Sequence, residues 1–141
     1  MTLRVQYPLL GRRTCDFDPR AKWFTAIYDE IRKQVPTEIL RLFFLPVSPA
    51  TGWIYRAQMG LLERRDSLTH IVTQMHSFLL RRSPKVPTVI TCYDLSVPWT
   101  LERLPLADRV IVPTRQVRDE ILRTAKLPHE PEVIHLAVPP A

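Results

Sequence analysis

The chain has 141 residues, 45% of them hydrophobic and 24% charged, which is the composition of an ordinary globular domain and excludes a disordered or fibrous chain. Its 20 basic and 14 acidic residues give a net charge of +6, which favours anionic partners such as phosphates, nucleotides, nucleic acid or an acidic membrane surface. No apolar run approaches the roughly 20 residues of a membrane-spanning helix.

The first third of the chain predicts a strand, a helix and a second strand. Residues 3–7 are the first apolar run, and Gly11 follows them as a turn. Asp18 suits the cap of a helix that Pro36 ends, because an aspartate accepts hydrogen bonds from the first free N–H groups. Residues 38–45 are almost continuously apolar, which is typical of a strand covered on both faces.

The middle of the chain predicts a second helix from residue 52. Ile54, Ala57, Leu61 and Leu62 share one side of this helix, so we expect them to be buried. Gly60 weakens the helix by about 1 kcal/mol relative to alanine.

Four further strands are expected, at residues 69–73, 88–92, 109–112 and 132–135. The last helix lies between the final two strands, with Thr114 as its cap and Val117, Ile121, Leu122 and Ala125 as its buried stripe. This alternation predicts a single α/β domain, a Rossmann-like parallel sheet with helices on both faces. We expect the domain to span residues 1–138 and residues 139–141 to be a stiff exit linker.

Several chemistries are excluded by what the chain lacks. It has only three glycines and contains neither a GxGxxG fingerprint nor a P-loop nor a GxSxG elbow. Cys15 and Cys92 do not have the spacing of a disulfide framework or a zinc site, and no cluster completes a set of ligands around the four histidines. We therefore expect no metal and no cofactor.

Ligands of open α/β sheets bind outside the carboxyl ends of the strands, so the residues after each apolar run are the candidates for a site. These residues offer a flexible backbone, cations, a proton acceptor and a helix N-terminus; they are Gly11, Arg12, Arg13, His76, Tyr93, Asp94 and Thr114.

Each candidate also has a purely structural interpretation. Arg12 and Arg13 suit a solvated surface, and His76 suits a core or surface histidine whose hydrogen bonds are satisfied. Asp94 suits a turn cap with Ser96, although a carboxylate at the end of a buried strand needs hydrogen bonds or an exposed cleft. Thr114 is most simply a helix cap.

Three stretches in this order resemble the amino-terminal, acceptor-side domain of family 4 glycosyltransferases, enzymes with two facing Rossmann-like domains. They are "VPTVITCYDL", "ADRVIVPTRQVRDEIL" and "PEVIHLAVP", and the match extends over about residues 68–139. The chain departs from the family where Gly11 stands alone instead of a Gly-Gly pair, where Tyr93 replaces a histidine and where Ala137 replaces a glycine.

The resemblance implies the acceptor-side half of an enzyme that moves a sugar, with retention of configuration, from a nucleotide-diphosphate donor to a hydroxyl acceptor. Tyr93 and Asp94 would be catalytic. The acceptor and phosphate would be bound by Gly11, Arg12, Arg13, His76 and Thr114. The donor would be bound by a carboxy-terminal domain that this sequence lacks or by a partner chain. We therefore expect the chain to be inactive alone. We interpret it as cytoplasmic and peripheral to an anionic membrane, with no specific nucleic acid partner.

Two alternatives remain open. The first is a non-catalytic basic α/β module that binds nucleic acid, anionic lipid or a protein partner. The second is a flavodoxin-like receiver or mononucleotide domain that uses Asp94, although a receiver needs an acidic pair after its first strand and this chain has "GRRT" there.

Overall fold

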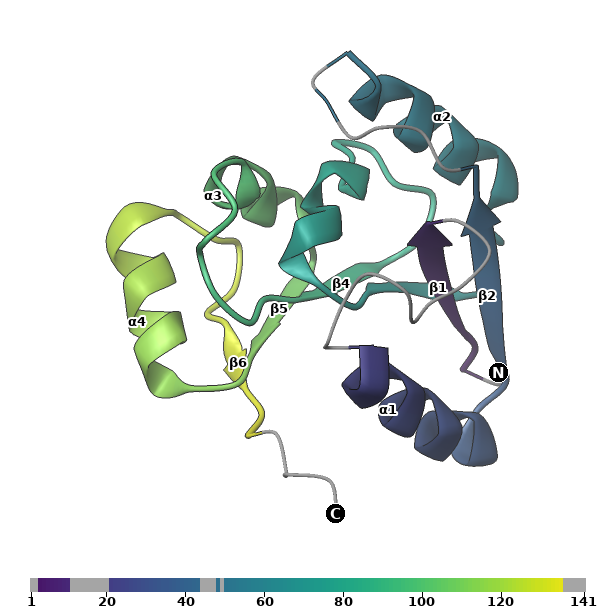
Figure 1. Ribbon diagram of the computed structural model, residues 1–141, viewed down its shortest axis with the longest axis horizontal. Coiled ribbons are helices and arrows are strands. Elements are labelled where there is room, and N and C mark those ends of the chain that lie inside the picture. The colour runs from purple at the N-terminus through teal and green to yellow at the C-terminus, as the bar shows by residue number, and fades with distance from the viewer. Residues whose placement is uncertain (1–2, 11–20, 44–47, 49, 136–141) are drawn as a thin grey trace.

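The computed structural model describes residues 3–10, 21–43, 48 and 50–135, with the backbone alone for residues 21–27. It contains a six-stranded, all-parallel sheet with helices on both faces (Figure 1), which confirms the predicted Rossmann-like α/β fold. The strands are β1 Val5–Leu10, β2 Thr37–Leu42, β3 Leu68–Ile71, β4 Thr88–Thr91, β5 Arg109–Val112 and β6 Glu132–Val133. The helices are α1 Ala21–Gln34, α2 Gly52–Leu62, α3 Thr100–Arg103 and α4 Arg115–Thr124, with short 3-10 helices η1 Gln74–Leu79 and η2 Leu104–Leu106.

The strand order is β2-β1-β3-β4-β5-β6. The chain leaves β1 toward one edge of the sheet to form β2, and then crosses back to place β3 on the other side of β1. This order, with one added strand, is that of flavodoxin-like doubly wound sheets. The winding direction reverses between β1 and β3, and ligands of such sheets bind outside the carboxyl ends of the strands at this point.

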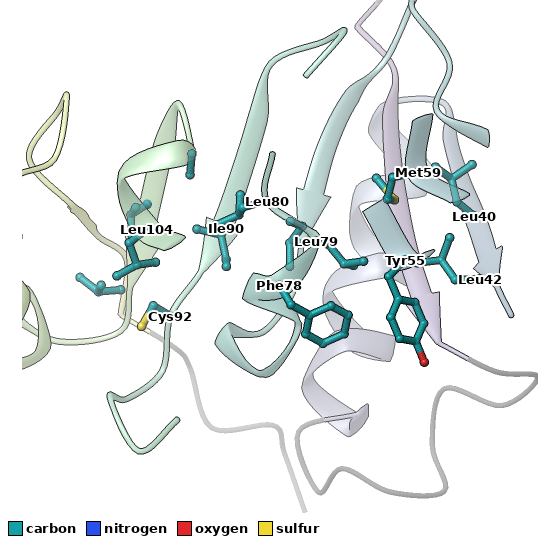
Figure 2. Close-up of a cluster of buried hydrophobic side chains, with 14 of the residues drawn as sticks. Leu40, Leu42, Tyr55, Met59, Phe78, Leu79, Leu80, Ile90, Cys92 and Leu104 are labelled. Atoms are coloured by element: carbon teal, nitrogen blue, oxygen red, sulfur yellow. The ribbon is translucent and has the colours of Figure 1, made fainter. Parts of the chain in front are cut away.

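The two faces of the sheet have separate hydrophobic cores. On one face, α1 contributes Tyr28, Ile31 and Val35 against Tyr7 and its neighbours in β1. The hydrophobic core on the other face is larger, and α2, η1, α3 and α4 cover this face (Figure 1). Figure 2 shows this core, in which the side chains of β2 and α2 lie on one side of η1 and those of β4 lie on the other. The sheet is therefore covered on both faces, which explains why its strands are so apolar.

Strand and helix boundaries differ from the predicted ones at several points. β1 begins at Val5 and continues to Leu10, because all six residues pair with β2. β3 and β4 end at Ile71 and Thr91, and β6 has only two residues, so these strands are shorter than predicted. Residues 44 and 45 of the second predicted strand, and the predicted cap Asp18, lie outside the described residues.

The predicted buried side of α2 is wrong. Leu61 is 86% exposed, whereas Gly52, Tyr55 and Met59 are the buried residues of this helix. Tyr55 and Met59 lie one turn apart and pack into the larger core, where the Tyr55 ring contacts Phe78 with 5.0 Å between ring centroids. The larger aromatic surface gains more from burial than the leucine does, so it decides which side faces the sheet.

A buried polar network joins the amino ends of β1 and β3 to the end of α2. The Gln6 amide donates to Thr69 Oγ1 at 3.0 Å, and Thr69 Oγ1 donates to Glu63 Oε1 at 2.8 Å. The other Glu63 carboxylate oxygen, Oε2, accepts a hydrogen bond from Arg81. Gln6 also bonds both main-chain polar groups of Arg64. Every one of these links crosses between elements, so the network fixes α2 against the sheet.

None of the helices in the described part of the chain is long and apolar enough to span a membrane.

Candidate functional site

Gln74 connects the carboxyl ends of β3 and β4 beside the reversal point of the sheet. Its side chain is fully buried. The amide oxygen accepts a hydrogen bond from the Tyr93 main-chain N–H at 2.9 Å, and the amide nitrogen donates to Asp94 Oδ1 at 3.1 Å. One side chain therefore holds both of the residues that the sequence predicts as catalytic.

Asp94 forms a turn as well as facing Gln74. Its Oδ1 accepts from the Ser96 main-chain N–H at 3.0 Å and from the Ser96 hydroxyl. The turn cap that the sequence suggested for Asp94 is therefore present. The carboxylate is half-buried, and these hydrogen bonds to Oδ1 fix its direction at the edge of the sheet.

Tyr93 is also half-buried, between a buried cysteine and Asp94. The preceding residue, Cys92, is fully buried in the larger core, and its thiol donates to the Asp94 main-chain oxygen at 3.2 Å. The backbone of residues 92–94 is therefore held by a thiol on one side and by Gln74 on the other. This support gives the Tyr93 and Asp94 side chains a rigid base.

His76 lies in η1, two residues after Gln74. Its backbone angles, φ −98° and ψ 17°, interrupt the regular 3-10 helix, and its ring meets the Phe78 ring edge-on at 5.9 Å between centroids. Thr73 caps the start of η1 by accepting from the Met75 main-chain N–H at 3.3 Å. The His76 ring thus packs against Phe78 within the same short helix, two residues after Gln74.

Thr114 follows β5, the strand next to β4. Its Oγ1 accepts from the Val117 main-chain N–H at 3.2 Å, so the predicted helix cap is confirmed. Ile121 is the buried residue of α4, while Leu122 is 43% exposed and so does not belong to the buried stripe. Thr114 itself is exposed, at the same edge of the sheet as Asp94.

The three remaining candidates, Gly11, Arg12 and Arg13, lie outside the described residues. They follow β1 directly, and the carboxyl end of β1 is next to that of β3.

Two buried hydroxyl groups belong to the segments that follow β3 and β4. Ser77 in η1 and Thr100 at the start of α3 are both fully buried, and their hydroxyl oxygens have no hydrogen-bond partner among the described residues. η1 and α3 pack against each other. No sequence pattern distinguishes these hydroxyls from ordinary helix residues, so sequence reasoning did not find them.

Sequence reasoning also did not find Gln74. The only local signal is a polar amide at the end of the apolar run "LTHIVTQM". Its hydrogen-bond partners, Tyr93 and Asp94, follow β4. Only the pairing of β3 with β4 therefore shows that Gln74 holds them.

The described carboxyl edge combines a positioned carboxylate, a phenol, a histidine and a helix N-terminus. Within residues 3–10, 21–43, 48 and 50–135, no three histidine, cysteine, aspartate or glutamate side chains gather as metal ligands. The groups present suit hydrogen bonding to hydroxyls and proton acceptance.

No protein-family model matches this chain, and no curated protein matches it.

Proposed function

We propose that the chain is the acceptor-side half of a glycosyltransferase, which binds a hydroxyl acceptor at the carboxyl edge of the sheet. In the transfer, the acceptor oxygen forms a bond to the anomeric carbon of the sugar. The bond from that carbon to the donor diphosphate breaks, and the diphosphate leaves with the electron pair. Asp94 accepts a hydrogen bond from the acceptor hydroxyl and then its proton.

The observation that carries the proposal is the fixation of Tyr93 and Asp94 by one buried amide, that of Gln74. These two residues lie in the stretch that resembles the family. Rigid support of a partly exposed carboxylate is what a binding site needs, because a hydroxyl must be held in one direction to react. Arg12 and Arg13 are proposed to lie near phosphate, since they follow the strand next to β3.

Acceptor binding can be tested without a donor. A panel of sugars and polyols is presented to the chain and binding is detected by saturation-transfer NMR. Asp94→Asn removes the charge but keeps an oxygen that accepts from Gln74 and Ser96, so the turn is retained. We expect Asp94→Asn, which replaces a charge-assisted hydrogen bond by a neutral one, and Tyr93→Phe, which removes a phenol hydrogen bond, each to weaken binding of any acceptor by about tenfold.

Two variants serve as controls. Thr114→Ala should weaken acceptor binding less than Asp94→Asn, and should mainly lower stability by about 1 kcal/mol through loss of the cap. Ser96→Ala removes one hydrogen bond to Asp94 but leaves its charge, so it should weaken binding less than Asp94→Asn. Equal affinity of Asp94→Asn and the wild type for every bound acceptor would exclude Asp94 from the site, and no bound acceptor at all would contradict the proposal.

A basic binding module is the second candidate, because the chain carries a net charge of +6. A module that binds a phosphate backbone loses affinity steeply as salt rises, whereas a neutral hydroxyl acceptor does not. The salt dependence of the same NMR signal therefore separates the two candidates.

A further inference from the structure

Three arginines gather around η1 on the helical layer of the larger core. Arg56 belongs to α2, Arg103 ends α3, and Arg82 follows η1 by three residues. Both α2 and α3 pack against η1, and Arg56 Nη1 donates to the Phe78 main-chain oxygen in η1 at 3.2 Å. Arg56 and Arg103 therefore lie on helices that meet at η1, and Arg82 lies in the segment that follows it; we call Arg56, Arg82 and Arg103 the arginine cluster.

The positive charges of the arginine cluster repel one another, and nearby acidic groups do not neutralise them. Within the described part of the chain, none of its members forms an ion pair with a carboxylate. Burial lowers the pKa of the Arg103 guanidinium, the charges of Arg56 and Arg82 lower it further, and Glu102 opposes them. A bound anion beside these charges would offset the repulsion between them.

The neighbouring basic residue shows what a satisfied arginine looks like in this protein. Arg81 directly precedes Arg82 but points to the buried carboxylate of Glu63. Arg64 likewise pairs with Asp66 and Glu38. The structure thus separates the Arg81–Arg82 pair into one internally neutralised side chain and one exposed side chain for which, among the described residues, no ion pair with a carboxylate is found.

The Arg56 guanidinium is held across the start of α2. A Cβ added to Gly52 would lie 3.0 Å from Arg56 Nη1 and 3.8 Å from Cζ, so the guanidinium lies close to a position that glycine leaves open. Gly60, further along α2, has no such neighbour: an added Cβ would meet Arg81 Nη1 at an ordinary 3.7 Å. The absence of a side chain at Gly52 is therefore part of how Arg56 reaches the arginine cluster.

We propose that the arginine cluster binds a phosphate dianion, either free phosphate or the phosphomonoester of a ligand or lipid headgroup. Each guanidinium presents a planar fork of N–H donors that matches phosphate oxygens. A carboxylate carries one charge and would leave most of the repulsion, whereas a phosphate monoester carries about −1.5 to −2 at pH 7 and bears three acceptor oxygens. The site is independent of the proposed sugar transfer and needs no donor.

The test is calorimetric titration of the full chain with inorganic phosphate at constant ionic strength, adjusted with sodium chloride so that screening is equal throughout. We expect saturable binding that Arg82→Gln and Arg103→Gln each weaken by about tenfold, because hydrogen bonds to a charged group contribute at least about that factor. Arg123→Gln on α4 removes the same charge from an exposed site and should change affinity by less than about twofold.

Two further readouts separate a binding role from a structural one. Without phosphate, Arg103→Gln should leave the unfolding temperature unchanged or raise it, because the repulsion falls; a structural arginine would lower it. Gly52→Ala should weaken phosphate binding by displacing Arg56, whereas Gly60→Ala should not.

Flotation with equimolar phosphatidylcholine–phosphatidic acid vesicles, against pure phosphatidylcholine vesicles, identifies the source of the phosphate. Binding that depends on Arg82 and Arg103 supports the site in either assay, and the assay in which it appears distinguishes a soluble phosphate from a lipid headgroup. The proposal is overturned if neither assay shows binding, or if binding survives Arg82→Gln and Arg103→Gln unchanged.

Discussion

Gln74 is the residue on which the candidate site most depends, because its two amide atoms bond two different residues of the next strand's end. Replacing it by methionine keeps the length of the side chain but leaves the Tyr93 N–H without its amide partner. A buried polar group that loses its partner costs about 1–3 kcal/mol. We therefore expect Gln74→Met to lower the free energy of unfolding by that amount and to weaken acceptor binding.

Urea denaturation measures the first effect, and Gln116→Met is the matched control. Gln116 is exposed in the first turn of α4, so the same change should alter stability by less than about 0.5 kcal/mol. Equal stability of the two variants would show that the Gln74 bonds contribute nothing.

His70 predicts a dependence of stability on acidity. Burial lowers the pKa of its imidazole from 6.5 to about 4, and the ring bonds Thr91 Oγ1 at 2.8 Å and lies 5.4 Å from the Tyr7 ring. The unfolded chain therefore binds a proton between pH 6.5 and pH 4 that the folded chain does not. Stability contributed by neutral His70 is complete above pH 6.5 and is lost as the pH falls toward 4.

The full pKa shift corresponds to a loss of about 3 kcal/mol in the free energy of unfolding. Because His70 is partly exposed, we expect a loss of about 2 kcal/mol. Urea denaturation between pH 7 and pH 4 measures it. The free energy of unfolding should fall less steeply with decreasing pH in His70→Gln, because glutamine does not titrate. Parallel pH profiles of the two proteins would show that His70 does not cause the loss of stability.

Residues with local partners were predictable, and those with distant partners were not. Thr114 caps a helix three residues away, and Asp94 caps a turn with Ser96, so both roles follow from short stretches of sequence. Gln74 and the arginine cluster acquire their roles only when separate elements pack together. Tyr93 at the position of a family histidine stays a prediction.

At the scale of elements, the Glu63–Arg81 pair attaches the end of α2 to the segment after η1. The Glu63 side chain is fully buried and that of Arg81 is 15% exposed. Burial lowers the pKa of Arg81, so the charge is kept at a cost that the carboxylate offsets. Arg81→Met leaves Glu63 as an uncompensated buried charge and should destabilise the fold by about 3–5 kcal/mol.

Thermal and urea denaturation measure this loss, and the adjacent Arg82→Met provides the control with the same change of residue type. Arg82 is exposed, so its variant should shift stability by about 0.5 kcal/mol or less. Adding Glu63→Gln to Arg81→Met should recover part of the loss, because the remaining group is then neutral. A destabilisation as small as that of Arg82→Met would mean that the pair is not buried in solution.

Periodicity predicted where most elements lie but not always which side faces the core. The last helix shows the predicted stripe at Val117, Ile121 and Ala125. In α2, two apolar sets compete, and the set with Tyr55 and Met59 is buried. A pattern of apolar residues cannot choose between two such sets, because the choice depends on the shape of the surface that the helix meets.

At the scale of the whole molecule, the alternation of strands and helices was sufficient to predict a parallel sheet, because crossovers between parallel strands need a helix or a long connection. The order of the strands was not predictable in this way. The reversal between β1 and β3 results from α1 packing on one face and all later helices on the other. That reversal places β3, which Gln74 follows, next to β1.

The last prediction concerns activity of the whole chain. Its sequence has only three glycines and no glycine-rich phosphate cradle, so we expect the chain to lack most of the donors that stabilise a departing diphosphate, and such donors commonly supply several kcal/mol of barrier reduction. Orientation of two substrates is missing as well. We therefore expect no release of nucleoside diphosphate from UDP-, GDP- or ADP-sugars by this chain alone, measured by a coupled assay, and transfer only when a donor-binding domain is added. In the complemented enzyme, Asp94→Asn should lower kcat by about a hundredfold or more, the usual contribution of a general base, and Thr114→Ala should lower kcat much less. Robust turnover by the chain alone would contradict the half-enzyme proposal, and wild-type turnover of complemented Asp94→Asn would show that the proton goes elsewhere.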